Sequence, residues 1–372
     1  MLESISTQSI LFLMLYGGAA VMALLLCLYL LLRRGNAIVA DITPPLRLRR
    51  WAAAFFGIAA LGHLYWFLYY VFFSESRFCG YVVVVVLDCV TLLITISGTL
   101  LSMLQDRKRS AWPIAVAAIP IVILGGLQIA WPGIEFLSFA LFYTLALYVL
   151  FTIYLVVATR QYGRWLRDNY ADLEHKEMWL SHTLLILTFL LVLIYGFTTD
   201  DTSFLFMRIA DFVLFGLLLW RVETLPQLDV ASKHEENVQS APSVSQEADS
   251  QMQKPQVIPS NIGQLLAEHC VDTKLYLQRD LTLVLLSAAV GINRSYLSQY
   301  FSSQGMNYNA YINGLRINHF VSLYQEAVAT QRSFTVQQLA SDSGYRSYST
   351  FSLAFKQRMG QSVTAWMRDT EG

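Results

Sequence analysis

Apolar residues along this chain gather into seven long blocks separated by short polar stretches. Each block is about 18 to 25 residues long, the length that a helix needs to cross a hydrocarbon layer roughly 30 Å thick. A buried soluble core would not need such uniform lengths, so the pattern predicts a bundle of seven transmembrane helices. The blocks are residues 8–32, 51–73, 81–104, 111–130, 134–158, 178–198 and 203–220.

Composition supports the same class of protein. The chain has 372 residues, of which 55% are hydrophobic and only 14% are charged. Such a sequence is too apolar for a soluble protein of two domains. We therefore predict an all-α protein with a polytopic membrane domain over residues 1–220.

Lys and Arg side chains predict the orientation of this domain. Twelve of them lie in the loops after the first, third and fifth blocks, and the opposite loops hold only Arg77. The positive-inside rule then places the N-terminus outside and, after seven crossings, the C-terminus in the cytoplasm of a cell with an inner membrane. The twelve are Arg33, Arg34, Arg47, Arg49, Arg50, Arg107, Lys108, Arg109, Arg160, Arg164, Arg167 and Lys176.

The composition changes after the last block. Residues 221–260 are rich in Ser, Gln, Glu, Pro and Val, with no sustained apolar period. This predicts a flexible linker to a domain over residues 261–372. A flexible linker transmits rotation or piston motion poorly, which favours a signal that acts through proximity, dimer state or proteolytic release.

Near the C-terminus the pattern predicts two short helices around a turn. Val336, Leu339 and Ala340 are spaced as one helical face, Gly344 marks a sharp turn, and Ser347 is the predicted N-cap. Phe351, Phe355 and Met359 then recur at i, i+4 and i+8 and are predicted to face inward. An exposed helix that carries Ser, Thr and Lys on its free side suits the DNA major groove.

The same pattern occurs upstream, between Asp280 and Phe301. Leu283, Leu286 and Val290 precede Gly291, and Leu297, Tyr300 and Phe301 follow it. Between the two units, residues 310–329 carry Tyr311, Leu315, His319 and Leu323 at helical spacing. We expect a connecting helix of roughly 30 Å, close to the roughly 34 Å between successive major-groove faces on one side of a duplex.

These residues resemble the DNA-binding domain of AraC/XylS-type transcription regulators. The matching segments are LTL at 281–283, YLSQYF at 296–301, YINGLRI at 311–317, QLASDSGYRSYSTFSLAFK at 338–356, and Gly360 with Trp366 and Arg368. The resemblance covers about a quarter of the chain and implies binding to double-stranded DNA through two helix-turn-helix units. Leu353 stands where this family frequently has a long polar residue, which leaves the second unit with little hydrogen-bonding capacity.

We predict which side chains contact DNA from their outward positions on the two second helices. They are Arg294, Ser295, Ser298 and Gln299 in the first unit and Arg346, Ser347, Ser349, Ser352 and Lys356 in the second. Lys274 to Arg368 holds nine basic residues against three acidic ones, a net of +6. This excess is modest, so a single domain should bind weakly and a homodimer on DNA is expected.

Ionisable residues inside the predicted spans are costly and indicate function. His63, Asp88, Arg208 and Asp211 are such residues, and together they would line an outward-facing polar pocket or would only lock helices together. The predicted outer loops are short, so a chemical signal has to enter the bundle or come from lipid or a partner protein.

No cofactor or metal site is predicted. His63 and His182 lie at different depths, which argues against a bis-histidine haem, and no span contains the lysine that a retinal Schiff base needs. Cys27, Cys79, Cys89 and Cys270 lack metal-ligand spacing, and no catalytic constellation is present, so an enzyme is not expected.

Our interpretation is a membrane-embedded one-component transcription regulator whose seven-span domain senses a small-molecule, lipid or protein signal. RNA polymerase is an expected partner. Two alternatives remain. The chain would be a constitutive membrane tether for a DNA locus, or its bundle would bind or transport a solute and control genes according to occupancy.

Overall fold

The computed structural model describes residues 7–33, 36–38, 43–72, 77–173, 176, 179–197, 201–228 and 261–371. Over these residues the chain is helical, with one isolated β-bridge and no strand. It divides into two compact units. The first comprises Met1–Tyr162 and Glu177–Leu228, and the second comprises Gly163–Lys176 and Asp229–Gly372.

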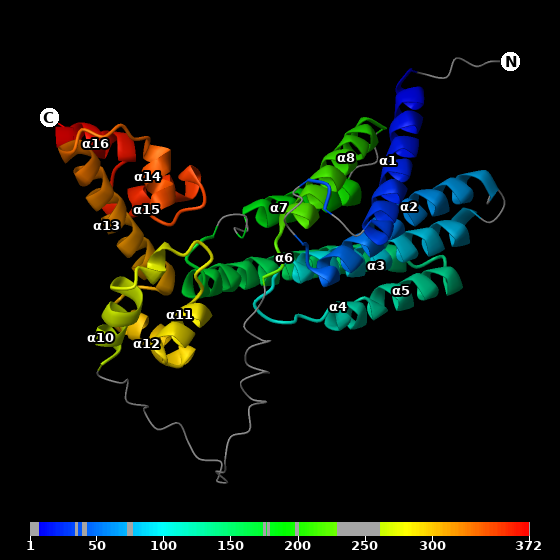
Figure 1. Cartoon of the computed structure of the whole chain (residues 1–372). Helices are drawn as coiled ribbons and strands as arrows, with labels where there is room; N and C mark the ends of the chain where they lie inside the picture. The colour runs from blue at the N-terminus through cyan, green and yellow to red at the C-terminus, as the bar shows by residue number, and fades with distance from the viewer. Residues whose placement is uncertain are drawn as a thin grey trace, which may run out of the picture. The chain divides into compact units, whose positions relative to one another are not determined.

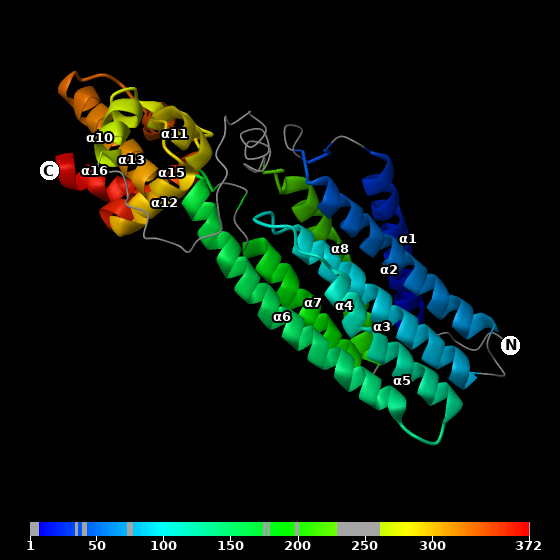
Figure 2. The ribbon, with the colours of Figure 1, turned by 90° about the horizontal axis from the view of Figure 1, so that it is seen from below.

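The first unit is built from apolar helices. They are α1 (Thr7–Leu32), α2 (Leu46–Phe72), α3 (Arg77–Ser102), α4 (Trp112–Ala117), α5 (Ile119–Ala130), most of α6 (Phe136–Asn169), α7 (Trp179–Phe197) and α8 (Asp201–Thr224). Helix α2 packs against α1 and α3, α8 packs against α1, α2 and α7, and α3 packs against α5. Figure 2 shows α1, α2 and α3 as neighbouring rods. Pro120, in the first turn of α5, follows the break at Ala118 that separates α4 from α5.

Five stretches among the described helices are long and apolar enough to cross a membrane. They are Ile10–Leu32, Leu46–Phe72, Phe78–Ser102, Trp112–Ala130 and Phe136–Asn169. Many large apolar side chains of these helices are exposed, as expected where lipid rather than protein would cover them. The predicted count of seven spans is not confirmed. The sixth and seventh blocks form α7 and α8, and α8 carries Arg208, Asp211, Arg221 and Glu223.

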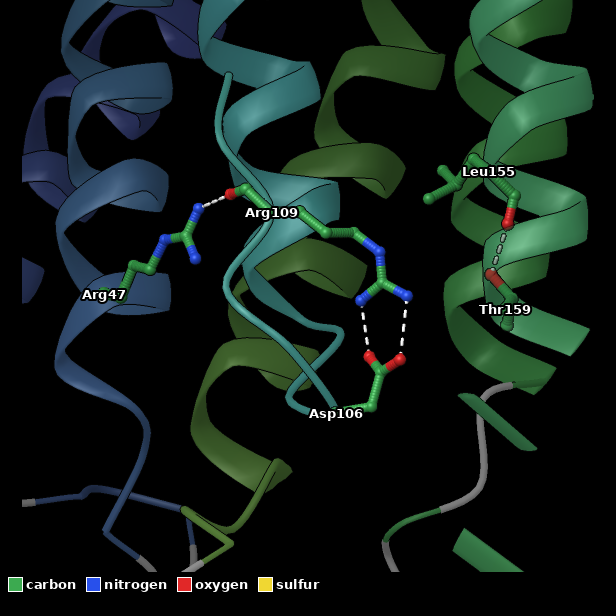
Figure 3. A network of polar contacts seen from close by, with 5 residues as sticks. All are labelled: Arg47, Asp106, Arg109, Leu155 and Thr159. Atoms are coloured by element: carbon green, nitrogen blue, oxygen red, sulfur yellow. Dashed lines mark hydrogen bonds and ion pairs between the residues drawn. The ribbon is translucent and has the colours of Figure 1, made fainter. Parts of the chain in front are cut away.

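A network of polar contacts holds the loop after α3 (Figure 3). Arg109 is 4% exposed and forms a two-pronged ion pair with Asp106, and Arg47 donates to the Arg109 carbonyl. In α6, Thr159 donates to the Leu155 carbonyl at 2.7 Å. Arg47 and Arg109 belong to the group that predicted the inner side, so two of those cations also have a structural role in the fold.

The start of the predicted linker is part of the first unit. Helix α8 continues to Thr224, and Val222, Leu225 and Leu228 are buried. Gln105 donates to the Pro226 carbonyl at 3.0 Å and accepts from the Leu228 amide at 2.9 Å. Residues 229–260, the remainder of the predicted linker, lie outside the described residues.

The second unit contains a chain of short helices around one long helix. They are α10 (Ile262–Leu266), a π turn (Ala267–Val271), a 3-10 turn (Leu275–Leu277), α11 (Leu283–Val290), α12 (Arg294–Ser303), α13 (Tyr308–Ala329), α14 (Val336–Asp342), α15 (Tyr348–Met359) and α16 (Val363–Glu371). Figure 1 shows α10 to α12 at one end of α13 and α14 to α16 at its other end. Each end has its own hydrophobic core.

Candidate nucleic-acid interface

The first predicted helix-turn-helix is formed by α11 and α12. Leu283, Leu286 and Val290 are buried as predicted, and Gly291 joins the helices at φ +71°, a conformation that glycine adopts without strain. Thr282 caps α11 by accepting from the Leu285 amide at 3.2 Å. The turn and the cap fix how α12 leaves α11.

Helix α12 presents the predicted reading residues on one side. Leu297 and Phe301 are buried on the opposite side, whereas Tyr300 is only partly buried. Arg294 and Ser298 are half-exposed, and Ser295 and Gln299 are exposed. Since these four positions recur at i, i+1, i+4 and i+5, they form a single face.

The second unit repeats this design with α14 and α15. Gly344 lies at φ +90°, and a Cβ there would stand 2.8 Å from the Leu277 carbonyl oxygen, so only glycine fits this turn. Ser347 is the N-cap of α15, accepting from the Thr350 amide at 3.3 Å, as the sequence predicted. Its hydroxyl is therefore engaged in the cap.

The free face of α15 contains the predicted polar residues and one apolar residue. Ser349 and Lys356 are exposed, Ser352 is half-exposed, and Leu353 is 52% exposed between them. Met359 was predicted to face inward and is 37% exposed, so that prediction was wrong. It is the last residue of α15, one turn beyond Phe355, and it does not belong to the second core.

Helix α13 joins the two units. It has 22 residues, or roughly 33 Å, close to the expected separation of major-groove faces. Tyr311, Leu315, His319 and Leu323, whose spacing predicted this helix, are half-buried. The most buried row is the adjacent one, which comprises Tyr308, Ile312, Arg316, Ile317, Phe320, Tyr324 and Ala327.

Arg316 connects the two helix-turn-helix units. It is 1% exposed, and its Nε and Nη2 donate to the carbonyls of Tyr276 and Gln278, both at 2.7 Å. Its guanidinium also lies 5.6 Å from the centroid of the Tyr345 ring, in the turn of the second unit. Burial lowers the pKa of Arg316, and the charges of Tyr345, Tyr308, Asp172 and Asp280 oppose that effect.

A second contact between the two units involves a predicted reading residue. Arg346 donates from Nη2 to both carboxylate oxygens of Asp280, at 2.8 and 2.9 Å. Both side chains are more than half exposed. The ion pair therefore holds Arg346 at the surface.

Two further surface residues were not predicted from the sequence. Tyr348, the first residue of α15, is 40% exposed, and Arg358 is exposed near its end. Helical spacing could have predicted them, since both positions lie next to the polar face of a helix that the sequence predicts. Of the nine cations counted in this domain, Arg316 is buried, so fewer positive charges reach the surface than the count suggested.

Comparison with known proteins agrees with this geometry. Residues 286–369 match the family model described as a helix-turn-helix domain. This segment is an AraC-type helix-turn-helix domain. The match covers both reading helices, α12 and α15, and the connecting α13. It implies that the AraC-type domain binds DNA, and it belongs to a regulator family rather than an enzyme family.

Outside this domain the comparisons are silent. No curated protein and no solved structure matches the chain. No family is named for the apolar helices.

The bundle of apolar helices, the first compact unit, brings together three of the four ionisable residues predicted inside the spans. Arg208 forms an ion pair with Asp211 at 3.0 Å and contacts His63 Nε2 at 2.8 Å. The Nδ1 of His63 bonds to the Ala59 carbonyl at 2.7 Å. Tyr16 of α1 donates to the His63 carbonyl at 2.5 Å, and the Arg208 guanidinium lies 5.7 Å from the centroid of the Tyr16 ring. Helices α1, α2 and α8 therefore meet at this cluster.

Asp88 has a different partner. The indole of Trp66 donates to its carboxylate at 3.3 Å, and a Cβ at Gly62 would stand 2.8 Å from Asp88 Oδ1. Gly62 thus allows α2 to approach this carboxylate closely. In the part of the chain that the structure describes, no group of three His, Cys, Asp or Glu side chains is arranged to hold a metal ion.

Proposed function

We propose that this protein is a membrane-embedded transcription regulator that binds specific DNA sequences through its AraC-type domain. The observation that carries the proposal is the pair of reading helices, α12 and α15, each with a buried apolar side and a free polar side, within a segment that matches the helix-turn-helix family. The five apolar helices support attachment to a membrane. The DNA-binding domain would lie in the cytoplasm, where it meets DNA and RNA polymerase.

Specific contacts would come from the faces of α12 and α15. Arg294, Ser295, Ser298 and Gln299 would reach one major-groove segment, and Ser349, Ser352 and Arg346 the next. Lys356 would contact phosphate, and Ser347 would donate its O–H while its oxygen accepts in the cap. Because the net positive charge of the domain is modest, two copies of the chain on paired sites would be needed for firm binding.

The DNA-binding proposal is tested with the full chain in lipid nanodiscs and a pool of genomic fragments. The wild type should enrich a defined set of fragments. The substitution Gln299→Ala should weaken binding to them by about 1–3 kcal/mol and relax the preference at one position. Gln325→Ala is the matched control, since Gln325 is exposed on α13 away from both reading helices. Absence of sequence-selective enrichment by the wild type would refute the proposal.

The bundle of apolar helices, the first compact unit, would be the sensor. Its site would be the cluster of Tyr16, His63, Arg208 and Asp211. These contacts join three helices through charged and polar groups, so a ligand, lipid or proton that displaced one of them would alter helix packing. Asp88 with Trp66 would form a second polar point between α2 and α3. No identity for the signal is proposed.

Asp211→Asn tests the sensor because it removes one charge of the cluster without changing its shape. The expected result is altered reporter transcription with no solute flux into vesicles, and Glu135→Gln, at an exposed position, should behave as wild type. Unchanged output would favour the constitutive tether. Flux that Asp211→Asn abolishes would favour the transporter.

A further inference from the structure

The segment that follows α6 contributes to the hydrophobic core around α11 and α12, in the second compact unit. Ala171 is 1% exposed and belongs to the hydrophobic cluster around α11 and α12. The other buried members of that cluster are Ile262, Leu266, Cys270, Tyr276, Leu281, Leu283, Leu286, Val290, Leu297, Phe301, Tyr308 and Ile312. A residue 90 positions before the start of this domain, at residue 261, thus completes its first core.

Side chains of α13 bind the backbone of this segment. The Asn309 amide donates to the carbonyls of Tyr170 at 3.1 Å and Ala171 at 2.7 Å. Asn313 donates to the Ala171 carbonyl at 3.4 Å and to Asn309 Oδ1 at 3.1 Å, which orients the Asn309 amide. On the other side, Tyr170 forms an antiparallel β-bridge with Thr282. Recognition of backbone groups together with a slot for a small side chain is how proteins bind extended peptides.

The next residue, Asp172, lies near the junction of the two helix-turn-helix units. Asp172 is 7% exposed, and Lys176 donates to its carbonyl at 2.9 Å. Its charge acts on both Arg316 and Tyr345, although burial is the larger influence on the pKa of each. Arg316 and Tyr345 form one of the contacts between the two helix-turn-helix units.

We propose that Thr282, Asn309 and Asn313 form a peptide-binding site on the DNA-binding domain, that its occupant is Tyr170–Asp172 of the same chain, and that its occupancy controls DNA binding. Helix α6 runs without a break to Asn169 and is one of the five helices able to cross a membrane. A shift or rotation of α6 therefore moves Tyr170 directly. The signal reaches the DNA-binding domain through this contact and need not pass along residues 229–260. The control of DNA binding rests on the function proposed above, whereas the contact itself does not.

Disulfide trapping in the full chain tests whether the site is occupied in a membrane. Side chains opposite each other in an antiparallel bridge have Cβ atoms about 4.5–5.5 Å apart, so the pair Tyr170→Cys and Thr282→Cys should form a disulfide on oxidation. A protease site inserted between residues 229 and 260 makes the result visible, because only a cross-linked chain stays in one piece after cleavage. The pair Tyr170→Cys and Ser302→Cys, with Ser302 exposed elsewhere in the domain, is the control and should separate.

The regulatory part of the proposal is tested by DNA binding of the trapped protein. We expect the Kd for a selected DNA site to differ at least about fivefold between the oxidised and reduced forms of the pair at positions 170 and 282. The double substitution Asn309→Asp and Asn313→Asp removes the amide donors at constant size and should abolish trapping, whereas Asn318→Asp, exposed on the same helix, should not.

Three results would each refute a different part of the proposal. No cross-link at positions 170 and 282 in a chain that binds DNA selectively would refute the peptide-binding site and leave the proposed function standing. An efficient cross-link with equal Kd in both redox states would refute control through the site. Efficient trapping in a wild-type background that selects no DNA would confirm the contact and refute the proposed function.

Discussion

The guanidinium carbon of Arg316 lies 5.6 Å from the centroid of the Tyr345 ring. Arg316 belongs to the connecting helix and Tyr345 to the turn of the second reading unit, while the two hydrogen bonds of Arg316 reach Tyr276 and Gln278 beside the first unit. One buried side chain therefore joins three parts of the DNA-binding domain.

Arg316→Lys should destabilise the domain, because a single ammonium nitrogen cannot take the places of both Nε and Nη2. Losing one hydrogen bond to a charged group costs about 1.5–3 kcal/mol. Thermal unfolding of the purified full chain should show a lower Tm for the transition of this domain. Arg332→Lys, at an exposed position, serves as the control and should leave that transition unchanged.

Arg346 is predicted to exchange its partner Asp280 for DNA. Arg346→Ala should weaken specific binding by about 1–3 kcal/mol. Asp280→Asn should strengthen binding, because it frees the guanidinium and removes a negative charge from the surface. Neither change should alter stability by more than about 1 kcal/mol, since the pair is exposed. Equal losses of affinity in the two variants would mean that the ion pair only holds the units together.

Leu353 is an apolar side chain on a face that otherwise suits DNA, and we expect it to contact the methyl group of a thymine. Replacing single thymines of a selected site with deoxyuridine removes that methyl group alone. The wild type should bind one such substituted site more weakly, and Leu353→Ala should bind the two forms equally. If no deoxyuridine substitution affects the wild type, this contact does not exist.

Cys79 offers a native probe of membrane orientation. It is an exposed, free thiol near the start of α3, at the predicted outer end of that span. A membrane-impermeant maleimide added to spheroplasts should label it, and Cys79→Ser should remove the label. Cys270 should stay unlabelled even in opened membranes, because burial raises its pKa to about 11. Labelling of Cys79 only after the membrane is opened would reverse the proposed topology.

His319 makes the stability of the DNA-binding domain depend on pH. Burial lowers its pKa below 6.5, helped by Lys274 and opposed by Asp342. The unfolded chain then binds a proton more readily than the folded one, so stability should fall as the pH drops below about 6.5. The Tm of the domain should decrease between pH 7.5 and pH 5.5, and His319→Gln should reduce that decrease. An identical pH profile in the variant would rule out His319 as its source.

Local patterns were enough to predict several parts of this molecule. The buried positions of α11, α14 and α15, the turn glycines Gly291 and Gly344 and the Ser347 cap depend on neighbours within one or two helical turns, so their signals are present in short windows. Helical spacing also predicted that α13 exists. It did not reveal which row of this helix is the most buried, because an arginine at position 316 does not look like a core residue.

Contacts between distant segments were beyond such reasoning. Asp280 and Arg346 are 66 residues apart, and each alone looks like an ordinary surface charge. Ala171 looks like a loop residue after a membrane span, and nothing nearby indicates that it fills a core built from residues 262–312. His63 and Arg208 were both suspected of a role, but their 2.8 Å contact depends on how α2 and α8 pack.

The sequence by itself determined the helical class, the apolar segments and the AraC-type reading helices, because each follows from periodicity, turn chemistry and side-chain type along a continuous stretch. Tertiary structure decided how those parts work together. Burial of Arg316 joins the two reading units, and the docking of Tyr170–Asp172 joins the end of α6 to the first of them. Both depend on how the chain folds, because backbone carbonyls of one segment accept hydrogen bonds from side chains that are far away in the sequence.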